Sequence, residues 1–128
     1  MEEEFRALLL ADSGVSSHVG PRINFGEHPQ GISWPAIVLN TISNSQGYTL
    51  EGPSGPTTAR VQADCYAETY GAAKQLSRAV MSLLSGYQNG AFQGVFHAGS
   101  RDGREGGTNE VDRPFKVSMD FMVNFNKT

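Results

Sequence analysis

The sequence has one cysteine and no long apolar run, and both shortages narrow the classes of protein to which it can belong. Cys65 alone cannot form an internal disulfide or supply a cysteine-rich zinc cage. The longest apolar run, residues 7–11, is far short of the roughly 18 residues that a membrane span needs. The start of the chain, Met1 to Glu4, is acidic, whereas a secretory signal begins with basic residues. We therefore expect a cytoplasmic protein without membrane contact.

Positive charge is also scarce. Ten lysines and arginines stand against thirteen acidic residues, which gives a formal net charge of −3. Nucleic-acid-binding domains normally carry a basic excess or a basic stripe, so the charge argues against that class. With 128 residues, of which 38% are hydrophobic, the chain is expected to fold as one domain over residues 1–128 with a core of its own.

Hydrophobic periodicity predicts two main helices. Residues 2–12 place Phe5, Leu8 and Leu9 on one face behind an acidic first turn. A short helical turn over residues 15–19 and a brief strand over residues 22–25 are expected to follow. Residues 69–85 give the clearest helix, with Thr69 as its N-cap. Its apolar stripe consists of Ala72, Leu76, Ala79, Val80, Leu83 and Leu84.

Four further segments are predicted to be strands: residues 36–43, 57–66, 91–101 and 115–125. The first is apolar on both faces, which is typical of a central strand. The second and fourth alternate, so one face of each should be buried. The residues expected to point outward are Arg60, Gln62, Asp64, Tyr66, Lys116, Ser118, Asp120, Met122 and Asn124.

The segments between these elements are rich in glycine, proline or charge, and residues 26–35, 44–56 and 102–113 are expected to be loops. The predicted fold class is α+β. We expect a single, mostly antiparallel β-sheet with helices packed on one face and a long C-terminal β-hairpin.

No pattern in the sequence predicts catalysis. His18, His28 and His97 lack neighbouring ligand types, and Cys65 lies on an inward strand face. Residues 103–108 resemble a phosphate loop superficially, but they lack the Gly-Lys-Ser/Thr ending and join two strands. We therefore expect no catalytic residue, no metal and no cofactor, and we rank an enzyme below a structural protein.

Features of a subunit with several partners are present instead. Met81 is predicted to lie on the polar side of its helix, and Met122 on the outward face of the last strand. Residues 102–113 are either a solvated hairpin tip or a segment that orders against a neighbouring subunit.

Several segments, taken in order, carry a family resemblance, and residues 60–70 are the most specific of them. The others are residues 5–12, 20–23, 29–31, 35–38, 47–50, 52–55 and 117–121. Together they resemble the small tail-completion proteins of long-tailed phages and prophages, often described as tail terminators.

The resemblance implies an α+β sheet with a helical layer and no catalytic motif. It also implies a ring, usually a hexamer, at the head-proximal end of the tail tube. Such a ring ends tube growth and docks to the head–tail connector, and DNA passes through its lumen without specific binding. The expected location is the tail or neck of a virion that is assembled in the cytoplasm of a bacterial host.

No signature fixes the interface residues of this family, so the candidate contacts with other subunits and with the tube form a hypothesis. They are Tyr48, Thr49, Leu50, Glu51, Arg101, Asp102, Arg104, Glu105, Glu110, Asp112, Arg113 and Met122. The alternatives are a neck or head-completion adaptor, a tail-tube subunit with a similar long hairpin and, ranked lower, a small enzyme or a nucleic-acid module.

Overall fold

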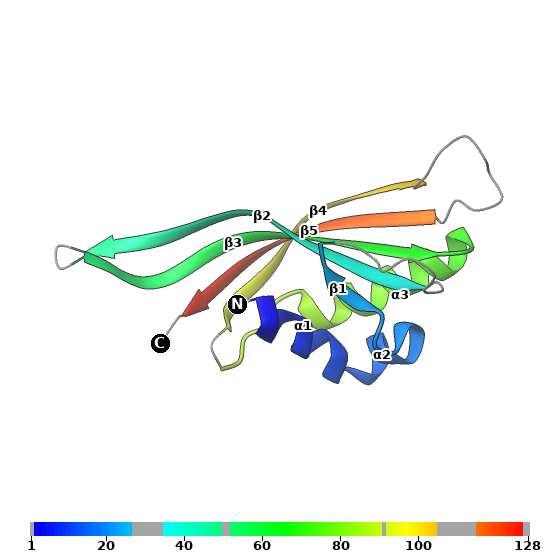
Figure 1. The fold of residues 1–128 in the computed structure, drawn as a ribbon, viewed down its shortest axis with the longest axis horizontal. Helices are drawn as coiled ribbons and strands as arrows, with labels where there is room; N and C mark the ends of the chain where they lie inside the picture. The colour runs from blue at the N-terminus through cyan, green and yellow to red at the C-terminus, as the bar shows by residue number, and fades with distance from the viewer. Residues whose placement is uncertain (1, 27–34, 50–51, 91, 105–114, 127–128) are drawn as a thin grey trace.

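A computed structural model describes residues 2–26, 35–49, 52–90, 92–104 and 115–126 (Figure 1). The elements follow the predicted order closely, and both main helices are confirmed. In chain order they are α1 (Glu2–Ala11), α2 (Ser13–Val19), β1 (Ile23–Phe25), β2 (Ala36–Thr49), β3 (Gly52–Ala67), α3 (Tyr70–Leu84), β4 (Phe92–Arg104) and β5 (Phe115–Asn126).

The strands form one sheet in the spatial order β1-β2-β3-β5-β4. Only the β1–β2 pair is parallel; β2–β3, β3–β5 and β4–β5 are antiparallel. The three described helices lie on one side of this sheet (Figure 1). The predicted α+β class and the C-terminal hairpin of β4 and β5 are therefore confirmed, and β2 lies between β1 and β3 over residues 37–39. None of the described helices has the length and apolarity to cross a membrane.

The hydrophobic core lies between the helices and the adjacent sheet face. The inward positions predicted for β3 and β5 are buried, including Val61 and Phe121 at 0% exposure, except Phe115, which is partly buried. From the other side, Phe5 and Leu9 of α1 and Leu76 of α3 meet them. Each large apolar side chain buried in this way contributes about 1.5–3 kcal/mol.

Polar caps fix the ends of the helices. The Thr69 hydroxyl accepts a hydrogen bond from the Ala72 amide at 3.1 Å, as the sequence predicts. The Asp12 carboxylate caps α2 in the same way, accepting from the Val15 amide at 3.0 Å. Gly86 follows α3 with a φ of 78°, the left-handed conformation in which helices often end.

Two of the predicted loops are wrong in whole or in part. Residues 44–49 continue β2, and β3 begins at Gly52. Proline is tolerated at the start of β3 because the described part of β5 ends opposite Pro56. The residues of β3 before Pro56 therefore have no described strand on the β5 side to which a backbone N–H would donate. Residues 102–104 continue β4, where each pairs with a residue of β5. Residues 105–113 lie outside the described residues, as do 27–34 of the predicted loop 26–35.

The predicted exposure of several side chains is also wrong. Asp64, Tyr66, Ser118 and Asp120 belong to the outward set, yet each is 7% exposed or less. Alternation along a strand sets the direction of a side chain, whereas its exposure depends on its neighbours across the sheet. Met81 is partly buried and packs against the core, so it is not an uncovered methionine on the polar side of α3.

Candidate assembly surfaces

The sheet face that points away from the helices carries rows of side chains from three adjacent strands, some exposed and some buried. Met122 of β5 lies between Arg60 of β3 and Phe96 of β4 in the cross-strand register. One row further along, Gln62 lies beside Asp120. We call this surface the open face and define it by Arg60, Gln62, Asp64, Phe96, Arg101, Ser118, Asp120 and Met122.

A continuous polar network crosses the open face. Arg60 donates to Oδ2 of Asp120 at 2.9 Å, and the Arg101 guanidinium lies 3.6 Å from the same oxygen. Arg101 also donates to Oε1 of Gln62 at 3.2 Å, and the Gln62 amide donates to Asp64 at 2.9 Å. The two arginines therefore link carboxylates from two strands.

The buried end of this network is held by a short hydrogen bond. Ser118 donates to Oδ1 of Asp64 at 2.6 Å, and the two residues are 1% and 5% exposed. A hydrogen bond to a charged group contributes about 1.5–3 kcal/mol, roughly twice a neutral one. Asp64 and Ser118 are thus a fixed structural part of the open face rather than freely solvated groups.

Asp120 has one oxygen that the described part of the chain leaves unsatisfied. Its Oδ1 is buried and accepts no hydrogen bond, whereas Oδ2 receives Arg60. A buried carboxylate oxygen without a donor is unusual in a folded protein. Oδ1 of Asp120 is thus an acceptor without a donor among the described residues.

Large apolar side chains flank this polar centre. Phe96 on the open face and Ile42, at a bulge in β2, are each 53% exposed. The Phe96 ring lies over Gly94, where a β-carbon would come within 2.8 Å of it. Exposed apolar groups around a charged centre are common on surfaces that bind other proteins.

The far end of the β2–β3 hairpin projects beyond the rest of the sheet (Figure 1). The last β3–β5 pair is Pro56 with Asn126, so residues 47–49 and 52–55 form a ribbon of only two strands, which we call the arm. A two-stranded ribbon is at best marginally stable alone in water. The arm is therefore a candidate contact with another chain.

A second charged cluster lies toward the opposite end of the sheet, on the helix side. The Asp102 carboxylate accepts from the Tyr70 hydroxyl at 2.8 Å and from the Lys74 ammonium at 3.0 Å. The hydrogen bond from Lys74, followed by that from Tyr70, lowers the pKa of Asp102. The same bond to Asp102 raises the pKa of Lys74. The cluster ties the end of β4 to the first turn of α3.

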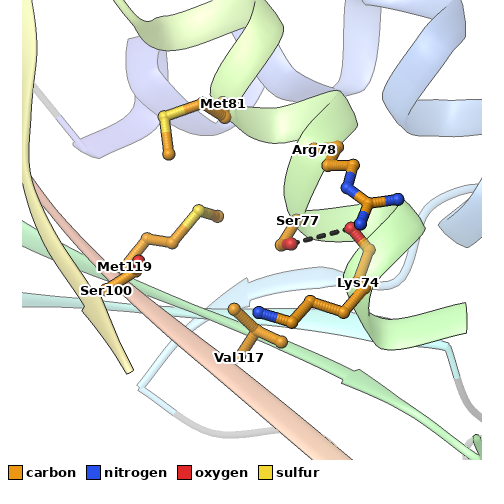
Figure 2. Close-up of a pocket in the computed structure, with 7 residues that line it drawn as sticks. All are labelled: Lys74, Ser77, Arg78, Met81, Ser100, Val117 and Met119. Atoms are coloured by element: carbon orange, nitrogen blue, oxygen red, sulfur yellow. Dashed lines mark hydrogen bonds between the residues drawn. The ribbon is translucent and has the colours of Figure 1, made fainter. Parts of the chain in front are cut away.

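A cavity of about 190 Å³ lies next to this cluster, between α3 and the sheet. Figure 2 shows Met81 and Met119 pointing into it from opposite sides, with Lys74 and Arg78 along the helix. Ser77 donates to the Lys74 carbonyl at 2.8 Å, which occupies its hydroxyl within α3. The remaining lining residues are Ser100 and Val117.

Cys65 and His97, two of the groups considered for chemistry, lie four residue rows apart along β5. Cys65 is fully buried, and this burial raises the pKa of its thiol well above the ordinary value. His97 packs edge-on against Phe121, with ring centroids 5.6 Å apart. In the described part of the chain, no three histidine, cysteine, aspartate or glutamate side chains come together as a metal site. His28 lies outside that part.

The predicted contact residues separate into distinct places. Arg101 and Met122 share the open face, whereas Asp102 faces the helices. Arg104 ends β4, and Tyr48 and Thr49 lie in the arm at the other end of the sheet (Figure 1). The candidates outside the described residues are Leu50, Glu51, Glu105, Glu110, Asp112 and Arg113.

Sequence reasoning missed the centre of the open face. Arg60, Asp120 and Phe96 were not among the candidate contacts, although the alternation assigned Arg60 and Asp120 to outward positions. The missing information was the pairing of β3 with β5, because residues 60 and 120 meet only when those two strands are neighbours.

Comparison with known proteins supports an assembly role. The sequence matches the family described as "Tail completion protein gp17" over residues 3–125. Among solved structures, the fold is similar to a chain of "Virion of native gene transfer agent (GTA) particle". The TM-score is 0.73 and the sequence identity 15%, and the match covers 94% of this chain and 90% of that chain. At this identity the likeness shows the fold alone. None of the curated proteins matches the sequence.

Proposed function

Because the chain belongs to the family of tail completion protein gp17, and is therefore a structural protein of a phage-type tail, we propose that it is a tail terminator. Identical subunits form a ring, six in number, on the head-proximal end of the tail tube. The ring ends tube polymerisation and then docks to the head–tail connector. It assembles in the bacterial host cytoplasm, catalyses no reaction, and lets DNA pass without specific binding.

The observation that carries this proposal is the separation of the contact surfaces. The arm and the β4–β5 end lie at opposite ends of the long axis of the molecule (Figure 1). The open face lies between them; it exposes Phe96 and also carries Arg60 and Arg101. A subunit of a terminator ring must contact two adjacent subunits, the tail tube and the connector. Surfaces that face in different directions allow these contacts.

The charge of the chain fits a lumen through which DNA slides. With a net charge of −3, the subunit has no overall attraction for phosphates. On the open face, Arg60 and Arg101 are both directed to Asp120, so their charges are partly neutralised within the subunit. A ring of such subunits should not retain DNA by counterion release.

A tube-growth assay tests the proposal. Tail-tube subunits of the same phage are polymerised alone and with increasing amounts of this protein, and filament length is measured by negative-stain electron microscopy. We expect shorter tubes, each with one added ring at one end. Filaments of this protein itself would make it a tube subunit, and binding to the connector without binding to tubes would make it a neck adaptor.

A further inference from the structure

In the part of the chain that the structure describes, both outer edges of the sheet have stretches of backbone without a pairing strand. On one side, β1 covers β2 only at residues 37–39. The Gly26 amide also donates to the Leu39 carbonyl at 2.9 Å, and that is the last described bond on this edge. Among the described residues, 41–49 of β2 therefore form a free edge.

On the other side, β4 is covered only at its beginning. The Val95 amide donates to the Tyr87 carbonyl at 3.0 Å, and the Val95 carbonyl accepts from Gly86 at 2.7 Å. Beyond Val95, no described residue outside β5 bonds to the backbone of this strand. Within the same described part of the chain, residues 96–104 therefore form a second free edge, equal in length to the first.

The ladder identifies which backbone groups of β4 point outward. Because Val95 directs both of its backbone groups outward, Val95 and Val123 form a pair without hydrogen bonds between them. Hydrogen-bonded and non-hydrogen-bonded pairs alternate along an antiparallel ladder. Every second residue of β5, counted from Val123, therefore faces a β4 residue whose backbone N–H and C=O point outward. After Val95, the residues of β4 that direct their backbone groups outward are therefore His97, Ser100, Asp102 and Arg104.

Free edges of this length are normally protected, and the edge of β2 is not. Lysine, proline and other charges on an edge strand block pairing with a second chain. Residues 41–49 carry no charged residue and no proline, and Ile42 is 53% exposed. The β4 edge carries Arg101, Asp102 and Arg104; Arg101 contacts Asp120 and Asp102 binds Lys74 within the subunit. Bulges interrupt both edges. The longest stretches of these edges without a bulge are residues 43–46 of β2 and residues 99–104 of β4, which we call the two runs.

We infer that residues 99–104 of one subunit pair with residues 43–46 of the next, which joins the sheets of neighbouring copies around the ring. This inference rests on the proposed function, because it specifies how the terminator subunits meet. The directions of the strands support it. Within one subunit, β2 and β4 run in opposite directions. Rotating a subunit about a ring axis parallel to the strands leaves their directions unchanged, so β4 of one subunit and β2 of the next form an antiparallel pair. Two different edges meet, which is the heterologous contact that a closed ring requires.

The offset between the two runs is also compatible with closure. By the register, their centres lie about six residue rows apart, or about 20 Å at ~3.3 Å per residue. In the joined rows each subunit contributes four strands, β2, β3, β5 and β4, because β1 covers β2 only at residues 37–39; four strands at ~4.8 Å are about 19 Å wide. Aligning the runs therefore tilts the strands by about 46°, just above the ~35–45° of closed sheets.

The test replaces one outward amide. Ser100→Pro removes an N–H that β5 does not use, and Gly99 before it accepts the extended conformation that proline requires. Ser100→Ala loses the same hydroxyl and keeps the N–H. We expect Ser100→Pro to need about tenfold more protein for half-maximal ring formation on tail tubes, with Ser100→Ala unchanged. Equal assembly of both folded variants would overturn the inference.

Amide hydrogen exchange gives a second measurement on the unaltered protein. We expect the Ser100 and Asp102 amides to exchange quickly in the single subunit and slowly in the ring, while Arg101, directed to β5, stays protected in both. Rings with fast exchange at Ser100 and Asp102 would overturn the edge pairing and leave the terminator role intact. Absence of rings, alone and on tubes, would instead contradict the terminator role.

Discussion

Replacing Arg60 tests whether the open face depends on its ion pair. The Arg60 side chain is 42% exposed, whereas that of Asp120 is 11% exposed, so Arg60→Ala leaves a largely buried carboxylate with Arg101 at 3.6 Å. Exposed pairs contribute about 0.2–1 kcal/mol, whereas breaking a buried pair costs about 3–5 kcal/mol. Because solvent screens the Arg60 side of the pair, we expect Arg60→Ala to lower the free energy of unfolding by about 1.5 kcal/mol, between these two ranges.

Replacing Asp120, the partner of Arg60, should lower the free energy of unfolding by a smaller amount. Asp120→Ala also removes the ion pair, but it deletes the unsatisfied Oδ1 and leaves two arginines that water can solvate. We expect a loss of about 0.5 kcal/mol, and a coupling energy of about 1 kcal/mol in the double variant. The asymmetry follows from the difference in burial between the two partners.

Urea unfolding followed by circular dichroism gives these free energies at 25 °C. At about 2.1 cal/mol/K of unfolding entropy per residue, Arg60→Ala should also lower Tm by about 5 °C. Arg78→Ala is the matched control, an exposed arginine of α3, and should stay within about 0.5 kcal/mol of the unaltered protein. Additive effects of the two open-face substitutions, or an Arg60→Ala value equal to the control, would refute the reasoning.

Three further predictions concern the thiol, the charged cluster and the core. Because burial raises the pKa of Cys65, a thiol reagent at pH 8 should label the native protein far more slowly than the urea-unfolded chain, and equal rates would contradict its burial. Since the pKa of Asp102 is lowered from 3.8, its contribution to stability should be present above that value and decline as the pH falls below it; unfolding midpoints of Asp102→Asn should lack this part of the acid dependence. The pKa of Lys74 is raised from 10.5, so its contribution to stability is present below that value and declines as the pH rises through the folded-state pKa. Lys74→Met should abolish this part of the pH dependence of unfolding. Phe121→Ala should cost about 3–5 kcal/mol in urea unfolding, and Phe121→Leu distinctly less; a value below about 1 kcal/mol would contradict its central place in the core.

The elements with their own periodicity were predictable from the sequence. The stripe of α3 and the capping residue Thr69 are local features, and the alternation of β5 spans its length. Each pattern needs no knowledge of the partner that it packs against. The α+β class follows from these elements, because a sheet with one apolar face requires a layer of helices to cover it.

The features that depend on strand pairing were not predictable in the same way. Glycine and proline in residues 44–56 indicated a loop, but Pro53 lies beyond the reach of β5, where its missing N–H costs no ladder bond. Similarly, the burial of Asp64 follows from Ser118 on a strand more than fifty residues away. The candidate contacts therefore included Arg101 and Met122 but omitted Arg60 and Asp120.

Electron microscopy of tails assembled with and without this protein tests the central claim most directly. With the protein present, we expect tubes of uniform length that end, on the head-proximal side, in one ring of sixfold symmetry, and heads that attach there. Without it, the tubes should continue to grow and lack that ring. Tails of the same length and head attachment in both preparations would contradict the claim that this chain terminates the tail.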